Sequence, residues 1–126
     1  MTIVEEAQNL LDTAGISGID DTYTYNIPYS ESPDTKVTQV LITDNGSSAE
    51  SYGNDDFHAF TGEIELQIWY AAVDGIDYDA TEMAILKAFT AQHWQVSGWR
   101  RRVTDPDTKQ LSNTTYIRKT QNLRGN

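Results

Sequence analysis

The sequence predicts an α+β fold: a mainly antiparallel sheet of about five strands with two helices packed on one face, in the order α-β-β-β-α-β-β. Three observations lead to it: an amphipathic first segment, a strictly alternating strand at the centre, and a hairpin signature near the end. With 126 residues and no cysteine, we expect one domain over residues 1–126 that buries its core without disulfides.

The first element is a helix over residues 2–14. Apolar residues recur there at helical spacing, Thr2 is a candidate N-cap with Glu5 as its capping-box partner, and Gly15 ends the helix. Glu5 and Glu6 stand where a secretory signal carries basic residues, so we expect no targeting segment. The longest apolar runs, such as residues 68–73, are too short to cross a bilayer.

Two strands and a long loop follow. Residues 22–27 (TYTYNI) and 36–43 (KVTQVLIT) are rich in β-branched and aromatic residues, which favour strands. Residues 44–57 (DNGSSAESYGNDDF) have low hydrophobicity, two glycines and four acidic residues. That composition predicts a long polar loop.

Residues 60–71 (FTGEIELQIWYA) form the clearest strand. Alternation places Gly62, Ile64, Leu66, Ile68 and Tyr70 on one face and Thr61, Glu63, Glu65, Gln67 and Trp69 on the other. We expect the first face to pack against the helices and the second to meet water or a partner.

A second helix is expected over residues 80–92. Asp79 is its predicted N-cap and Glu82 its capping-box residue, with Ala80, Met83, Ala84, Leu86, Lys87 and Phe89 near one stripe. A histidine such as His93 is electrostatically favoured near the free carbonyls at a helix C-terminus, so His93 needs no catalytic role. Residues 94–104 and 109–123 then read as a β-hairpin around the turn TDPDTK.

Charge is distributed unevenly along the chain. Residues 1–99 carry 17 Asp and Glu against Lys36 and Lys87, whereas residues 100–126 carry seven Lys and Arg against two Asp. The formal net charge is −10. An acidic body disfavours nucleic acids and anionic membranes, while a basic end can pair with an acidic surface, including that of another copy.

The segment WRRRV at 99–103 admits two interpretations. Its arginines either neutralise acidic neighbours such as Glu63 and Glu65 across the sheet, or dock the acidic surface of another subunit, because Trp and Arg are enriched at binding hot spots. Alternation would place Arg100 and Arg102 on one face and Arg101 on the other.

Metal and catalytic motifs are weak. Asp55, Asp56 and His58 form a poor metal set, and helix capping explains Asp79 and Glu82 better than a calcium loop that includes Asp74 and Asp77. No phosphate-binding loop or nucleophile elbow occurs in the sequence. We therefore expect a protein without cofactors or bound metals that is not an enzyme.

Several segments carry a family resemblance. The opening MTIVEEAQNLL, the stretch SYGNDDFHAFTGEIELQIWY, the helix running into FTAQHWQVSG and the closing TDPDTKQLSNTTYIRK resemble the tail terminators, or tail completion proteins, of long-tailed phages of Gram-positive bacteria. The resemblance covers nearly the full chain and is best between residues 51 and 119. It consists of strand and turn patterns, not of a catalytic fingerprint.

The resemblance implies a structural virion protein at the head–tail junction, assembled in the host cytoplasm. Such a protein forms a ring, usually a hexamer, that caps the tail tube and joins it to the head connector. Its partners would be itself, the tail-tube protein and a head-completion protein, with no membrane and no recognition of nucleic-acid bases. Alternatives left open are another neck ring or tube protein, a monomeric acidic binding module and, last, a small hydrolase.

Residue roles follow as a hypothesis for this ring. The expected subunit interface comprises Trp99, Arg100, Arg101, Arg102, Arg118 and Lys119 on one side and Glu63, Glu65 and Trp69 on the other. The expected tube or connector contact comprises the loop residues Asp44, Asn45, Glu50, Tyr52, Asp55 and Asp56.

Overall fold

The computed structural model of the chain describes residues 2–25, 35–53, 56–99, 102–106 and 108–122. Its elements run in the order α1 (Ile3–Ala14), β1 (Asp21–Thr24), β2 (Gln39–Gly53), β3 (Asp56–Trp69), α2 (Tyr78–Ala91), β4 (Gln95–Trp99), β5 (Val103–Thr104) and β6 (Leu111–Asn122). The α+β class and the element order agree with the sequence prediction, except that the strand expected over 94–104 is divided into β4 and β5.

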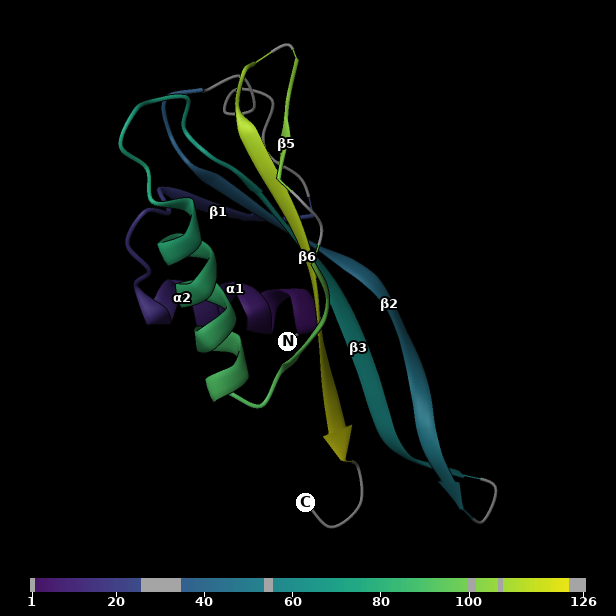
Figure 1. The fold of residues 1–126 in the computed structure, drawn as a ribbon. Helices are drawn as coiled ribbons and strands as arrows, with labels where there is room; N and C mark the ends of the chain where they lie inside the picture. Colours follow the sequence, from purple (N-terminus) through teal and green to yellow (C-terminus); the bar gives the residue numbers. More distant parts are fainter. Residues whose placement is uncertain (1, 26–34, 54–55, 100–101, 107, 123–126) are drawn as a thin grey trace.

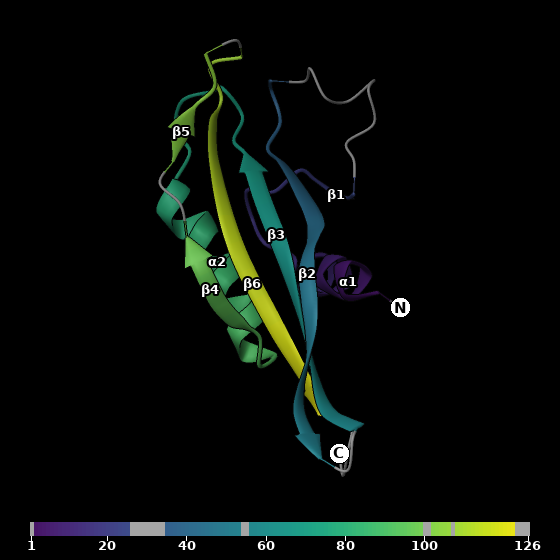
Figure 2. The ribbon, with the colours of Figure 1, turned by 90° about the vertical axis from the view of Figure 1, so that its right-hand side faces the viewer.

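The strands form one mixed sheet in the spatial order β1-β2-β3-β6-β4, with β5 pairing along β6. β1 runs parallel to the first four residues of β2, and every other pairing is antiparallel. In Figure 2, β2 and β4 lie towards opposite sides of the sheet, with β3 and β6 between them.

Both helices contribute to a core on one face of this sheet (Figure 1). The alternation predicted for β3 is confirmed, because Gly62, Ile64, Leu66, Ile68 and Tyr70 are all buried and the residues between them are partly exposed. β2 and β6 bring their own buried residues into register beside β3, with Ile42 opposite Leu66 and Ile117 opposite Ile64. One face of these three long strands therefore supplies the sheet side of the core, and α1 and α2 supply the other side.

α1 begins and ends where the sequence predicts. The Thr2 side chain accepts a hydrogen bond from the Glu5 N–H while the Glu5 carboxylate accepts one from the Thr2 N–H, which completes the capping box. These bonds to Thr2 lower the pKa of the Glu5 carboxyl. Gly15 ends the helix in the left-handed conformation, at φ 59°.

α2 differs from the prediction at both ends. Its N-cap is Asp77, whose carboxylate accepts from the Ala80 N–H, so Asp79 lies within the first turn and Glu82 is not a capping-box residue. The buried positions are Thr81, Glu82, Ile85 and Phe89, whereas Met83 is exposed. The helix therefore starts two residues earlier than predicted, because Asp77 and not Asp79 caps it. The residues that it buries also differ from the predicted apolar stripe, except for Phe89.

The C-terminus of α2 is closed by a Schellman motif. His93 adopts φ 68°, its N–H donates to the Thr90 carbonyl, and the Trp94 N–H donates to the Phe89 carbonyl. The rings of Phe89 and Trp94 pack edge to face with centroids 5.1 Å apart, which is the apolar contact that accompanies this motif. His93 thus has a structural role at the helix end.

The predicted polar loop over residues 44–57 is wrong. β2 continues through Gly53 and β3 begins at Asp56, so the segment forms the outer half of a β-hairpin in register with Phe57–Gly62. The backbone hydrogen bonds that pair β2 with β3 do not require apolar side chains. The low hydrophobicity of this segment therefore does not prevent strand formation. In both views of the fold the hairpin extends past the two helices (Figures 1 and 2).

Gly62 gives the first stability prediction. A Cβ at this position would lie 2.5 Å from Ile3 Cδ1, the far end of a side chain on α1. Gly62→Ala should therefore lower the free energy of unfolding by about 1 kcal/mol, since Ile3 must shift out of its site. Equilibrium denaturation in urea measures the change.

Ile3→Val provides the matched test of that cause. In the Ile3→Val background the clashing methyl is absent, so Gly62→Ala should cost markedly less there than in the parent chain. An equal cost in both backgrounds would contradict the contact as the reason.

Candidate functional site

The sheet face opposite the helices carries the candidate interaction surface. It presents Leu41, Thr43, Glu63, Glu65, Gln67, Trp69, Thr114 and Tyr116 as partly exposed residues and Arg118 as an exposed one, and among the described residues no helix lies over it. Half-exposed aromatic and carboxylate side chains on an uncovered sheet are the composition expected of a protein-binding surface. We call this set the open face.

Glu63 is held at the centre of the open face by two β-bulges. The bulge between Asp44 and Ser47 on β2 aims Asn45, whose Nδ2 donates to Glu63 Oε1 at 2.6 Å. The bulge between Val96 and Gly98 on β4 aims Ser97, whose hydroxyl donates to Glu63 Oε2 at 3.0 Å. Both carboxylate oxygens are thereby oriented, although sequence alternation alone gave no sign of either bulge.

Glu65 and Arg118 complete the polar part of the surface. The hydroxyls of Thr43 and Tyr116 each lie 3.5 Å from a Glu65 oxygen, which leaves Glu65 only loosely held. Arg118 lies opposite Glu63 in the strand register, and its Nε donates to Gln95 Oε1 at 3.2 Å. These side chains retain donor and acceptor capacity that a second molecule can use.

Arg102 lies elsewhere and binds α2. Its Nε donates to Glu82 Oε2 at 2.7 Å, its Nη2 donates to Glu82 Oε1 at 2.9 Å, and Nη2 also contacts Asp79. The Glu82 side chain is only 4% exposed, and the Tyr70 hydroxyl donates to it at 2.7 Å. The guanidinium also lies over the Tyr78 ring, 5.7 Å from its centroid.

This network shifts two pKa values. The hydrogen bonds to Glu82 and Asp79 raise the pKa of Arg102, which stays charged at every accessible pH. Burial, together with the hydrogen bond to Glu82, raises the pKa of the Tyr70 hydroxyl above its ordinary value. The carboxylate of Glu82 therefore has two donors that do not lose their protons in the physiological range.

The interpretation that the arginines neutralise acidic neighbours is confirmed for Arg102, but its partners are Glu82 and Asp79 on α2 and not Glu63 or Glu65. The simple alternation expected through 98–103 is also wrong, because β4 ends at Trp99 and Arg102 lies in the connection to β5. Of the predicted interface, Arg100 and Arg101 lie outside the described residues. Trp99 is described only as the last residue of β4.

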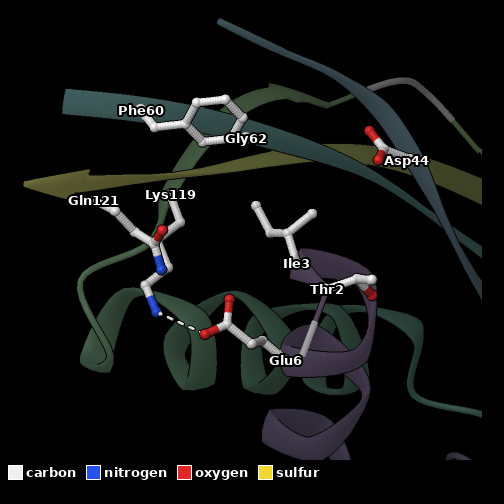
Figure 3. A pocket seen from close by; sticks show the side chains of 8 residues that line it. All are labelled: Thr2, Ile3, Glu6, Asp44, Phe60, Gly62, Lys119 and Gln121. Carbon is white, nitrogen blue, oxygen red and sulfur yellow. Dashed lines mark ion pairs between the residues drawn. The ribbon is translucent and has the colours of Figure 1, made fainter. Parts of the chain in front are cut away.

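Lys119 is also used within the chain. Its Nζ lies 3.5 Å from Glu6 Oε1 and 5.6 Å from the centroid of the Trp94 ring, joining β6 to α1. Figure 3 shows this ion pair at the side of a cavity of about 290 Å³ between α1, β3 and β6, into which Ile3 points. The Lys119 charge is therefore partly compensated inside the subunit.

The predicted loop contacts are distributed over the hairpin. Asp44, Asn45, Glu50 and Tyr52 are strand residues of β2, Asp56 begins β3, and Asp55 lies outside the described residues. The Asp44 carboxylate accepts from the Gly46 N–H at 2.9 Å, which stabilises the bulge. These residues thus occupy a projecting hairpin instead of a loop.

The acidic residues considered as cation ligands either make other contacts within the chain or lie outside the described residues. Asp77 caps α2, and Asp79 and Glu82 bind Arg102, so three of the four carboxylates in the calcium-like spacing make other contacts. Asp55 and the side chains of Asp56 and His58 lie outside the described part. Within that part, no group of three or more His, Asp or Glu residues could hold a metal ion, and no helix is long and apolar enough to cross a membrane.

Comparisons with known proteins find a matching family and similarities among solved structures. Residues 2–122 match the family described as "Protein of unknown function (DUF806)". No curated protein matches the chain. A sheath/tube terminator in the extended state, from an extracellular contractile injection system (PVC), is similar at 13% identity and a TM-score of 0.43.

That similarity spans 97% of this chain but 57% of the injection-system chain. At this identity and TM-score it transfers neither a fold nor a function.

Arg102 gives a second stability prediction. Arg102→Ala leaves a nearly buried carboxylate with only the Tyr70 hydroxyl, and the free energy of unfolding should fall by about 3 kcal/mol, the lower end for a buried pair. Arg118→Ala is the matched control, because Arg118 is exposed and its loss should cost about 0.5 kcal/mol or less. Adding Glu82→Gln to Arg102→Ala should recover part of the loss, as an uncharged amide is cheaper to bury. Urea denaturation distinguishes these cases, and similar costs for both arginines would refute the assignment.

Tyr70 gives a prediction for alkaline pH. Above a pH of about 10 the unfolded chain loses the phenolic proton that the folded chain retains, so stability from this group is complete below that pH and declines above it. Tyr70→Phe removes the group, and its free energy of unfolding should fall less steeply between about pH 9 and 11. Parallel urea titrations of both proteins give the two slopes, and identical slopes would argue against a raised pKa.

Proposed function

This chain belongs to the DUF806 family, and we propose that it is a non-enzymatic tail terminator: a structural protein that caps a phage tail tube. The proposal starts from the terminator-like sequence segments, which correspond to α1, the β2–β3 hairpin, α2 with β4, and β6. The observation that carries it is the open face, where Glu63 and Glu65 share one side of β3 with Trp69 without a covering helix among the described residues. Such a surface favours assembly over catalysis.

A ring requires that one patch of each subunit meets a different patch on the next. The acidic body and the basic terminal segment supply two such patches in one chain. The accessible surface is 7626 Å², so two contacts of about 800 Å² each would cover about a fifth of it. The surface is therefore large enough for two such contacts without an additional arm.

Two residues of the predicted subunit interface are bound within the subunit. Arg102 and Lys119 hold the basic segment against α2 and α1, so they act in the contact mainly by placing their neighbours. We assign the direct contacts to Trp99, Arg100 and Arg101 on one subunit and to Glu63, Glu65 and Trp69 on the open face of the next. Arg118, predicted on the first side, lies opposite Glu63 on the open face and therefore belongs to the second side.

The β2–β3 hairpin is assigned to the partners above and below the ring. It projects past both helices and carries acidic residues with no Lys or Arg between residues 39 and 57. Asp44, Asn45, Glu50, Tyr52, Asp55 and Asp56 would meet the tail-tube protein or the head connector. The protein would then reside in the virion, at the junction of head and tail.

The solution mass tests the ring. Light scattering should detect a hexamer-sized particle at low salt that dissociates as the ionic strength rises, because the proposed contact pairs opposite charges near the surface. Arg100→Glu with Arg101→Glu, leaving Arg102 intact, should abolish the particle without changing thermal unfolding. Lys87→Glu, a reversal on the exposed surface of α2, is the matched control and should leave it intact.

Mixing with tube subunits tests termination. A terminator stops elongation of polymerising tail tubes at substoichiometric amounts, whereas a tube protein adds to itself without limit and an acidic binding module has no effect on length. Tube length by electron microscopy decides among the three. Unchanged tube lengths in the presence of an intact ring would remove the terminator function.

A further inference from the structure

The bulge on β2 contains a dipeptide that favours a covalent change. Asn45 is followed by Gly46, and no other asparagine in the sequence is followed by glycine. The side chain of an asparagine can react with the backbone nitrogen of the next residue, and a glycine there has no Cβ to hinder the approach. We propose that Asn45–Gly46 is a site of spontaneous deamidation and that the hydrogen bond to Glu63 restrains this reaction in the folded chain.

The reaction needs only water. The backbone nitrogen of Gly46 attacks the side-chain carbonyl carbon of Asn45 and forms a C–N bond. The side-chain amide nitrogen of Asn45 leaves as ammonia and takes with it the proton of the Gly46 nitrogen. The product is a succinimide ring. Water then adds to one of the two ring carbonyls and opens the ring, which leaves aspartate or isoaspartate at position 45.

The bulge gives access to the reacting groups. Asn45 and Gly46 are exposed, and a Cβ at Gly46 would meet no atom of the described residues within 4 Å. Gly46 adopts φ 105°, in the region that favours glycine. Its N–H donates to Asp44 Oδ1 at 2.9 Å, which is within the distance that a general base requires to take a proton. Asp44 is therefore placed to assist the attack.

The leaving group of this reaction is held by the open face. Asn45 Nδ2 donates to Glu63 Oε1 at 2.6 Å, and the Ser97 hydroxyl donates to Glu63 Oε2 at 3.0 Å, which fixes the carboxylate from both sides. The bond between Nδ2 and the carboxylate must break before this nitrogen can leave as ammonia, and hydrogen bonds to charged groups are the stronger ones. The contact with Glu63 therefore slows the conversion of Asn45.

Conversion would change the open face at Glu63. An aspartate at position 45 has no amide donor, and it would bring a second carboxylate to the place where Nδ2 now lies 2.6 Å from Glu63 Oε1. Two carboxylates at this distance disfavour the ionised form of each other. Of its two donors, Glu63 would keep the Ser97 hydroxyl. The effect on assembly rests on the proposed function, whereas the conversion itself does not.

Peptide mapping by mass spectrometry tests the conversion. The full chain is kept at neutral pH and below its unfolding transition, and the peptides that contain asparagine are followed over time. Asn45 should become a mixture of aspartate and isoaspartate before Asn9 changes, because Asn9 is exposed but is followed by leucine. Conversion of Asn9 while Asn45 stays intact would overturn the proposal.

Substitution of Glu63 tests the restraint. Glu63→Ala removes the acceptor and should speed the conversion of Asn45 by about tenfold or more, the factor for one hydrogen bond to a charged group. Glu63→Gln keeps an oxygen acceptor without the charge, so its rate should lie between those of the parent chain and Glu63→Ala. Gln67→Ala is the matched control, because Gln67 lies on the same face of β3 but opposite Leu41 and away from the bulge. It should convert at the parental rate.

Thermal unfolding of each variant verifies the fold. Equal rates in the parent chain and in folded Glu63→Ala would remove the restraint, and an intact Asn45 in folded Glu63→Ala would remove the site. Asp44→Asn keeps an acceptor for the Gly46 N–H but cannot take its proton, so it should slow the conversion by about tenfold. An unchanged rate in this variant would remove Asp44 from the reaction.

Light scattering of Asn45→Asp separates this inference from the proposed function. The variant should associate about tenfold more weakly than the parent chain at low salt, because Glu63 loses a donor and gains a repelling charge. Equal association of the two chains would overturn the effect on the open face. Absence of any particle from the parent chain would contradict the ring, and the rates of Asn45 conversion would still decide the covalent change.

Discussion

The alternation of β3 is the constraint on which the rest of the structure depends. Every second residue from Gly62 to Tyr70 is buried beneath the helices, and the residues between them lie on the open face. Because β2 and β6 must match this strand to bury Ile42 and Ile117, their registers are fixed as well. A shift of the β3 register by one residue would bury Glu63 and Glu65 and expose the core residues. The same alternation therefore determines both the core and the proposed interaction surface.

The buried Glu82 carboxylate connects this core to the surface. It accepts one hydrogen bond from the hydroxyl of Tyr70, the residue after β3, and two from Arg102 in the connection between β4 and β5. Removing an ion pair from water is costly, and bidentate geometry with a third donor offsets that cost. The arginine run of an acidic protein thus has one member that anchors the segment to α2, while Arg118 remains at the surface.

In the described part of the chain no helix covers the open face, and an exposed surface that combines apolar and charged side chains favours association with another molecule. The bulges on β2 and β4 bring Asn45 and Ser97 to the two oxygens of Glu63. The same irregularities of the backbone therefore fix the orientation of a carboxylate at the centre of this surface.

The sequence by itself determined the elements whose signals are local: α1 with its Thr2–Glu5 capping box, the two faces of β3, the closing hairpin strand and the α+β class. It placed Glu63, Glu65 and Trp69 correctly on one face, because a period of two needs no tertiary information. The tertiary structure decided the rest: residues 44–53 became a strand through a backbone ladder that composition does not encode, β1 paired in parallel, and Asp77 capped α2. The tertiary structure also pairs Arg102 with Glu82. The two residues are 20 positions apart in the chain, so their contact depends on how α2 packs against the connection between β4 and β5.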